Sequence, residues 1–190
     1  MPGSAIWAEI VRYKILCQKK LLDDLGLDQA LLLEKYAAEV QPGDITNREG
    51  HSAKVYFNAL FGMSFKRCDN DFVNHALNYG YAILLSAFNR EIVANGFNTQ
   101  LGIAHKNEFN SFNLSCDLME PFRALVDRFV FCGARELTPE YKYSLCNILN
   151  ERVAISGEKC TVLSAISVYC KSVFEALDMG DAAIIKCYEL

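Results

Sequence analysis

Several features of other protein classes are missing from this sequence of 190 residues. Only 4 residues are proline, no segment is repeated or of low complexity, and 52% of the residues are hydrophobic. This composition excludes a disordered or collagen-like chain. No apolar run approaches the about 20 residues that a membrane-spanning helix needs. The length and composition predict one globular domain with a core of reasonable size and no membrane association.

No excess of positive charge marks the chain as a nucleic-acid-binding protein. It carries 19 Lys and Arg against 23 Asp and Glu, a formal net charge of −4 with neutral His. Nucleic-acid-binding domains usually have a basic excess, so the total charge argues mildly against that function.

The eight cysteines form neither a zinc-binding pattern nor a disulfide framework. No two are spaced as C-x-x-C, no paired histidine spacing accompanies them, and most lie in apolar helical stretches. No secretory signal is visible, and disulfide scaffolds are normally shorter chains. We therefore expect reduced thiols in a cytoplasmic protein.

Common catalytic signatures are also absent. The sequence has no G-x-x-x-x-G-K-[ST], no G-x-G-x-x-G and no H-E-x-x-H. Ser156 and Lys159 satisfy S-x-x-K, but they lie in a predicted hairpin turn without the motifs that accompany this pair in enzymes. Catalysis by a nucleophilic Ser or Cys has little support.

Apolar residues at spacings of three and four predict a mainly α fold, a single helical domain of about six to seven helices. The longest helix is apolar nearly all round and is expected to be central and buried. The segment RVAI-SGEK-CTVL predicts a short β-hairpin near 152–161. In the first predicted helix, six residues recur at helical spacing and therefore share one face: Trp7, Ile10, Val11, Lys14, Ile15 and Gln18. The predicted helices span residues 7–23, 28–40, 46–61, 71–95, 115–131, 138 onward and 162–178.

Residues 96–115 have no regular period and predict a long ordered loop, a kind of segment that is usually functional or disordered. Phe97, Phe109 and Phe112 favour order there. His105, one of only 3 histidines, lies in this loop. A loop histidine is more often a surface residue or bonded to the backbone than a metal ligand, so both interpretations remain open.

Glu49 is a second candidate, at the start of the third predicted helix. Thr46 and Glu49 form a T-x-x-E capping box, in which Glu49 returns a hydrogen bond to the backbone of the cap. Capping alone is therefore a sufficient explanation for Glu49.

Asp117 and Glu120 are the third set of candidate site residues. Their i, i+3 spacing predicts that both lie on one side of a first helical turn, where the helix dipole also favours acids. Taken with Glu49 and His105, they form a candidate site for Mg²⁺ or Mn²⁺, and Arg123 lies one turn beyond Glu120 to hold a phosphate.

At these residues the sequence resembles a known family. The segments that carry the resemblance are IWAEIVRYKILCQ, TNREGHSAKVYFNALFG, VNHALNYGYAILLSAFNREIVANG and TQLGIAHKNEFNSFNLSCDLMEPFRALVD. Together they are similar to the CRISPR-associated integrases of the Cas-one family, and most closely to the type II branch. The resemblance covers essentially residues 5–180 and implies the helical catalytic domain of a metal-dependent DNA endonuclease and integrase.

The resemblance implies a catalytic and metal-ligand set of Glu49, His105 and Glu120 with Mg²⁺ or Mn²⁺. Asp117 is expected as an accessory acid close to the ion, and Asn78 is expected to shape the site by hydrogen bonding. Many family members carry Asp at the last ligand position, where this chain has Glu120. Its extra methylene leaves the division of roles between Asp117 and Glu120 open.

Three basic residues are expected to contact DNA phosphates: Arg48, Lys54 and Arg123. They could equally be partners in surface ion pairs.

The resemblance also implies partners and a reaction. The family acts with Cas-two, forms a homodimer in the intact protein, and joins the 3′-hydroxyl of a DNA fragment to a phosphodiester of the CRISPR repeat. Other type II CRISPR proteins are further expected partners. Family members normally begin with a β-rich domain, which is not visible here, so residues 5–190 are expected to be the helical domain and residues 1–4 a remnant of recombinant expression.

Two alternatives to an integrase remain open at this point. The same three ligands would serve a metal-dependent hydrolase of nucleic acids or nucleotides. If Glu49 only caps its helix and His105 is only a loop residue, the domain is a non-catalytic helical assembly module.

Overall fold

The structure of the chain, a computed structural model, describes residues 2–133 and 136–189. It confirms the mainly α fold, with eight α-helices and one small sheet in the described residues. The helices are α1 (Pro2–Asp24), α2 (Ala30–Ala38), α3 (Arg48–Phe61), α4 (Phe72–Ala94), α5 (Asn113–Leu118), α6 (Arg123–Cys132), α7 (Pro139–Cys146) and α8 (Val162–Met179). Short 3₁₀ turns lie at η1 (Pro42–Asp44), η2 (Glu120–Phe122), η3 (Asn147–Asn150) and η4 (Ala182–Ile184). The prediction of six to seven helices was one short, and the terminal residues Met1 and Leu190 lie outside the described residues.

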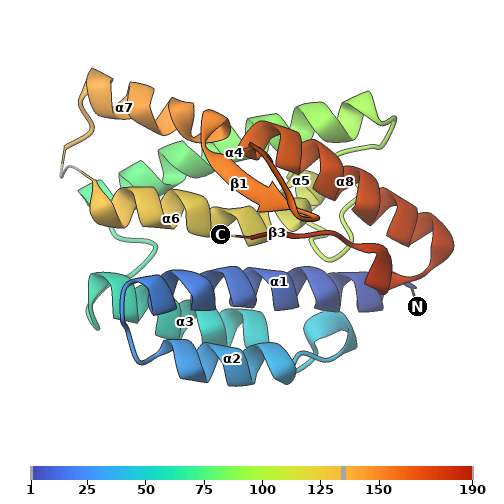
Figure 1. Cartoon of the computed structure of the whole chain (residues 1–190), viewed down its shortest axis with the longest axis horizontal. Coiled ribbons are helices and arrows are strands. Elements are labelled where there is room, and N and C mark those ends of the chain that lie inside the picture. Colours follow the sequence, from blue (N-terminus) through green and yellow to red (C-terminus); the bar gives the residue numbers. More distant parts are fainter. Residues whose placement is uncertain (1, 134–135, 190) are drawn as a thin grey trace.

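Helix α1 lies between two layers of the molecule (Figure 1). On one side it packs against α2 and α3, and on the other against η2, α6 and α8. Its buried positions repeat at helical spacing, as Ile6, Ile10 and Ile15 show with no exposed surface. Because α1 contacts both layers, a polar side chain on its buried face reaches the interior of the domain.

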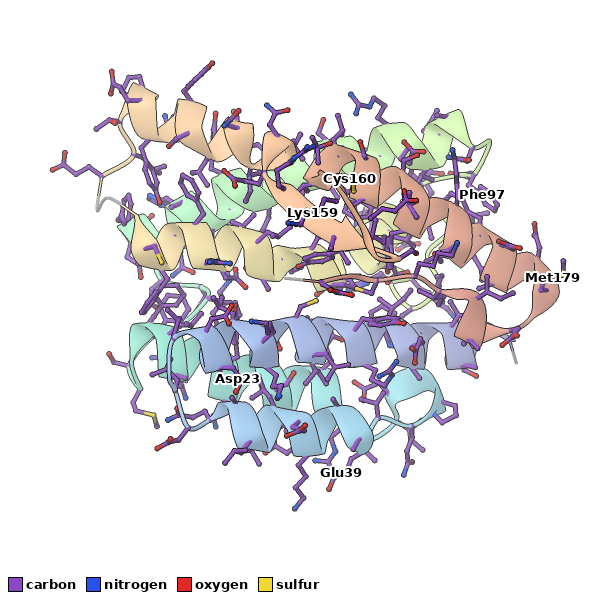
Figure 2. The ribbon with its side chains drawn as sticks, in the orientation of Figure 1. Asp23, Glu39, Phe97, Lys159, Cys160 and Met179 are labelled. Carbon is purple, nitrogen blue, oxygen red and sulfur yellow. The ribbon has the colours of Figure 1, made fainter. Side chains whose placement is uncertain are left out.

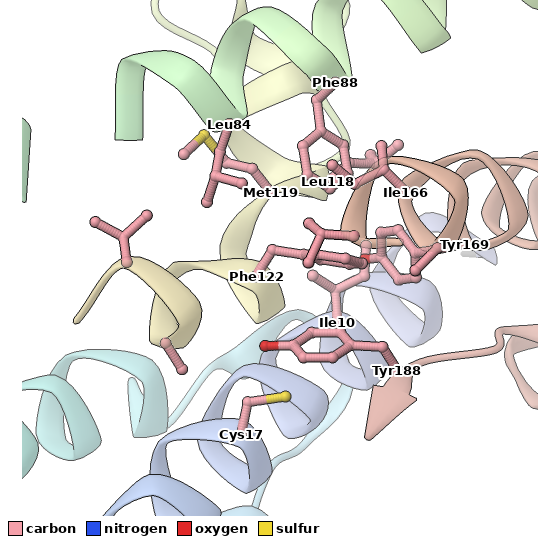
Figure 3. Packing of buried hydrophobic residues seen from close by; sticks show 14 of the residues in the cluster. Ile10, Cys17, Leu84, Phe88, Leu118, Met119, Phe122, Ile166, Tyr169 and Tyr188 are labelled. Carbon is pink, nitrogen blue, oxygen red and sulfur yellow. The ribbon is translucent and has the colours of Figure 1, made fainter. Parts of the chain in front are cut away.

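The core above α1 is built from aromatic and aliphatic side chains of α4, α5, η2 and α8 (Figure 3). Phe88 and Phe122 meet edge to face with centroids 5.2 Å apart, and Tyr169 packs against both. Helix α4 approaches α6 closely at Gly80, where a Cβ would lie 2.4 Å from a methyl group of Val126. The prediction that the helix over 71–95 is the central buried one is wrong, because α4 buries one face and exposes residues such as Asn78 and Arg90 on the other, and it is α1 that lies between the two layers.

The predicted hairpin is present as β1 (Arg152–Ile155) and β2 (Glu158–Thr161). A third strand, β3 (Tyr188–Glu189), pairs antiparallel with β1 on its other edge and was not predicted. The Tyr188 hydroxyl donates to the backbone oxygen of Pro121 at 3.0 Å. The C-terminal strand is thereby tied to the η2 turn, which carries Glu120.

The single helix predicted over residues 115–131 is wrong. The chain forms α5, then the 3₁₀ turn η2, then α6. Pro121 explains the break, because it has no N–H to donate to the backbone of the preceding turn and its ring disfavours a continuous α-helix. The break turns Glu120 away from Asp117, which decides how the site is arranged.

Within the described residues, no helix is both long and apolar enough to cross a membrane. The eight cysteines are free thiols, of which Cys17 and Cys170 are buried.

Candidate metal centre

Glu49 lies in the first turn of α3, whose start is held by two other residues. Asn47, in a left-handed conformation, accepts a hydrogen bond from the backbone N–H of Gly50. Asp44 accepts from the backbone N–H groups of both Arg48 and Glu49, at 2.8 and 2.9 Å. The Asp44 side chain therefore fixes the backbone from which Glu49 projects.

The predicted capping box of Thr46 and Glu49 is wrong. The Thr46 hydroxyl is buried and has no hydrogen-bond partner, and the Glu49 carboxylate points to Lys14. The physical reason is that Asp44, two residues before Thr46, already satisfies the first backbone donors of α3. Glu49 is thus free of a capping role, which removes the simplest structural explanation for it.

Glu49 and Glu120 converge on one ammonium group. The Nζ atom of Lys14, on the buried face of α1, lies 2.7 Å from Oε1 of Glu49 and 2.5 Å from Oε2 of Glu120. That oxygen of Glu120 is buried and lacks a partner of hydrogen-bond geometry, so its contact with Lys14 is an ion pair. Carboxylates from α3 and η2 therefore meet at a single point.

Burial and basic neighbours act in opposite directions on Glu120, whose side chain is 5% exposed. Burial by itself raises the carboxyl pKa, but Lys14 and Arg123 outweigh it and lower the pKa of Glu120 to about 2. Nε of Arg123 donates to Oε1 of Glu120 at 2.8 Å. Burial also opposes the charge of Lys14, yet Glu120 and Glu49 raise its pKa above the usual value. Glu120, Lys14 and Arg123 are therefore ionised at neutral pH.

His105 is oriented by Asp117. Nδ1 of His105 lies 2.5 Å from Oδ1 of Asp117, and the ring meets Trp7 edge to face with centroids 6.0 Å apart. The hydrogen bond to Asp117 raises the pKa of His105 against the effect of burial, and the charges of Glu120 and Glu49 raise it further. With Nδ1 engaged, Nε2 is the nitrogen left to bind a ligand, which is the usual arrangement of metal-binding histidines.

Asp117 also holds the backbone of the loop. Its Oδ2 accepts from the N–H groups of Ile103 and Ala104, and its Oδ1 accepts from the N–H of His105. The close approach of the loop backbone to Asp117 requires glycine at position 102. A Cβ there would lie 2.3 Å from the backbone oxygen of His105 and 2.9 Å from Oδ2 of Asp117. The long loop is ordered, as predicted, because a buried carboxylate gathers its backbone donors.

The expectation that Asp117 and Glu120 face the same side is wrong. Asp117 faces the backbone around His105, whereas Glu120 faces Lys14 and Arg123. The i, i+3 rule applies within a continuous helix, and Pro121 interrupts this one.

Replacing Asp117 with asparagine is expected to lower the free energy of unfolding by about 2–4 kcal/mol, because an amide cannot accept from all four donors and leaves some of them buried without partners. The pKa of His105 should fall, since the hydrogen bond that raises it is lost. Urea unfolding and an NMR titration of His105 measure the two effects. The half-exposed Asp23, changed to Asn, serves as a control with little effect. Equal stability of the Asp117→Asn and wild-type proteins would contradict this role.

A buried network beside the site was missed by the sequence analysis. Oδ2 of Asp127 accepts from the Tyr56 hydroxyl at 2.9 Å, and Oδ1 accepts from the Tyr81 hydroxyl. Burial raises the pKa of Asp127 to about 6, although both hydrogen bonds act to lower it. The guanidinium of Arg123 lies over the Tyr81 ring, 4.6 Å from its centroid, so the network supports the residue that holds Glu120.

Lys14 was also missed, although the sequence held a signal for it. It falls on the face of the first helix that otherwise carries Ile10, Val11 and Ile15, so its burial follows from helical periodicity. A lysine is almost never fully buried unless it is paired with acids.

The remaining predicted site residues make other contacts or are exposed. Asn78 is exposed and accepts from Arg67. Arg48 pairs with Glu39 at 2.9 Å, and Glu39 lies at the α2 edge of the molecule (Figure 2). Lys54 is exposed on α3. The structure therefore brings Glu49 and Glu120 together and places Arg123 beside them, while Arg48 is already engaged elsewhere.

The donors at this site suit a divalent cation by their chemistry, but they are not arranged as a finished metal cage. In the described residues, no three His, Cys, Asp or Glu side chains converge as metal ligands. The two carboxylates of Glu49 and Glu120 are instead joined by the ammonium group of Lys14, which lies between them. The buried carboxylate of Glu120, with an oxygen lacking a hydrogen bond, the partly exposed carboxylate of Glu49 and an oriented imidazole fit Mg²⁺ or Mn²⁺.

The fold and site define a mainly α-helical domain in which acids from separate elements gather among buried basic side chains. Residues 4–140 match the family described as CRISPR associated protein Cas1. The chain thus belongs to the Cas1 family, as the resemblance of its motifs indicated. It is 39% identical over 192 residues to the CRISPR-associated endonuclease Cas1 of Neisseria meningitidis serogroup C (strain 8013), covering 97% of this chain and 63% of that protein. The chain accordingly spans less than two thirds of the length of this curated relative.

Solved structures share the fold. A Cas6-RT-Cas1–Cas2 complex matches with a TM-score of 0.76 and 20% identity, over 97% of this chain and 25% of that chain. A casposase bound to integration product matches with a TM-score of 0.74 and 21% identity, over 93% of this chain and 64% of that chain. At these identities the likeness concerns the fold alone.

Proposed function

We propose that this chain is the catalytic helical domain of a metal-dependent DNA endonuclease and integrase of CRISPR adaptation. In the reaction, the 3′-hydroxyl oxygen of a DNA fragment forms a bond to a phosphorus of the CRISPR repeat. The oxygen that linked this phosphorus to the neighbouring nucleotide leaves and takes up a proton. Membership of the Cas1 family and the likeness in fold to a casposase bound to integration product support the proposal.

The observation that carries the proposal is the convergence of Glu49 and Glu120 on one point from two different elements. Together with Nε2 of His105, these carboxylates would hold Mg²⁺ or Mn²⁺. When bound, such an ion stabilises the negative charge that develops on the phosphoryl oxygens. Asp117 acts through His105, since both of its oxygens are occupied by the ring and the loop backbone.

Basic side chains beside the carboxylates suit a phosphate. A cavity of about 170 Å³ next to Glu120 is lined by three basic residues, Lys14, Arg67 and Arg123. Arg123 has a side chain 24% exposed, so it can support Glu120 and face a DNA phosphate from the same position. Phosphate contacts depend on basic side chains at the site, so the overall negative charge of the chain does not argue against them.

The partners follow from the same proposal. The solved complex that shares this fold contains Cas2, and the casposase is bound to the DNA product of integration. We propose DNA and Cas2 as partners of the intact protein, which would act as a homodimer in the cytoplasm.

A strand-transfer assay tests the proposal. The chain is incubated with Mn²⁺, a labelled DNA fragment bearing a 3′-hydroxyl, and a duplex containing a CRISPR repeat, with and without Cas2. A branched product in which the fragment is joined to the repeat is expected. It should be absent when the fragment ends in a 3′-deoxy nucleotide, because the attacking oxygen is then missing. Cleavage with no branched product under any of these conditions would instead identify a hydrolase.

A further inference from the structure

Lys14 occupies a position that an ion bound to both carboxylates would need. Its Nζ atom lies between Oε1 of Glu49 and Oε2 of Glu120. Two cations cannot share this position, both because their atoms would overlap and because like charges repel strongly in a buried site. If the proposed metal centre binds an ion between these oxygens, Lys14 has to move.

A second location for the ammonium lies within the same structure. The small cavity beside Glu120 is lined by Lys14 itself and by Gln18, one helical turn further along α1. Gln18 is 3% exposed, and its Oε1 atom is buried without a hydrogen-bond partner. Asp127 lines the cavity as well. An unpaired buried acceptor is costly, and an ammonium group in the cavity would satisfy it.

We propose that Lys14 is an internal counter-ion that exchanges position with the divalent cation. Without the ion, the ammonium lies between Glu49 and Glu120 and keeps the two carboxylates together. When the ion binds, Lys14 turns into the cavity and donates to Oε1 of Gln18. The inference rests on the proposed metal centre.

This exchange has two consequences for the site. In the ion-free protein the ammonium of Lys14 offsets the repulsion between the two carboxylates, so the site stays assembled before the ion arrives. Lys14 also remains charged after it moves, so it adds to the positive charge of Arg67 and Arg123 where a phosphate would approach.

Mn²⁺ titration calorimetry on four variants tests the exchange. Lys14→Met removes the competing charge, so Mn²⁺ should bind about tenfold more tightly than to the wild type. Gln18→Leu removes the acceptor that receives the displaced ammonium, so binding should weaken several-fold. In the double variant Lys14→Met/Gln18→Leu, the second change should have no effect, because no ammonium is left to relocate. Lys20→Met, an exposed position on the same helix, should bind like the wild type.

The Gln18→Leu variant distinguishes a change in Mn²⁺ affinity from a loss of folding. It retains Lys14 and removes an oxygen that has no partner, so its ion-free melting temperature should not fall. Equal Mn²⁺ affinity of the wild type, Lys14→Met and Gln18→Leu would overturn the exchange and leave the metal centre intact. Failure of all the folded proteins to bind Mn²⁺ would contradict the metal centre itself, and the exchange with it.

Discussion

Replacing His105 with alanine is expected to abolish Mn²⁺-dependent cleavage and joining of DNA, with a loss of at least about a hundredfold. Nε2 is the only imidazole nitrogen of His105 left for an ion, since Nδ1 is bonded to Asp117. Helix content should stay near native, because the His105 side chain is 45% exposed and lies in a loop. Product formation and circular dichroism measured on the same preparation separate the two effects.

His75 provides a matched control for this variant. It is an exposed histidine on α4 whose ring contacts Asn70 and lies outside the site. His75→Ala should keep full activity. If His105→Ala is as active as His75→Ala, His105 does not take part in the chemistry.

Replacing Glu120 with alanine is expected to have the largest effect on stability. The change removes the acid shared by Lys14 and Arg123, so it leaves Arg123 without this carboxylate partner and Lys14 with Glu49 alone. Breaking a buried ion pair in this way costs about 3–5 kcal/mol of unfolding free energy at neutral pH. Urea unfolding measures the loss, and the exposed Glu34, changed to alanine, should lose little.

The effect of Glu120 on stability should depend on pH in a defined direction. Its pKa is lowered to about 2 in the folded protein, so the unfolded state takes up the proton first as the pH falls. Its stabilising contribution is complete above the ordinary carboxyl pKa, about 4.5, and is lost as the pH falls towards 2. The difference between wild type and Glu120→Ala should therefore shrink between pH 6 and about pH 3. A difference that is the same at both pH values would contradict the pairing of Glu120 with Lys14 and Arg123.

The helices could be predicted because their signal is local. Apolar periodicity located most of the helices, and the segment RVAI-SGEK-CTVL located the hairpin. The strand at Tyr188 could not be found, because two residues carry no period and their pairing with β1 is a long-range contact. The helix predicted over residues 115–131 includes Pro121, which in the structure lies in the 3₁₀ turn between two helices.

The candidate site residues could be singled out in the sequence, whereas their partners could not. Glu49, His105 and Glu120 came from motifs, and motifs are visible in a single sequence. The pairing of Lys14 with both glutamates joins three elements far apart in the chain, so only the folded structure shows it. The capping role assigned to Glu49 failed for a related reason, because Asp44 competes for the same backbone donors through a turn that the T-x-x-E pattern does not describe.

The metal centre is tested most directly by an anomalous difference map from crystals of this chain soaked with Mn²⁺. One strong peak is expected within coordination distance of the Glu49 and Glu120 carboxylates and of Nε2 of His105. In the same map, Lys14 should have turned away from the carboxylates towards Gln18. A well-ordered site with no peak, and Lys14 still between Glu49 and Glu120 at saturating Mn²⁺, would contradict both the metal centre and the exchange.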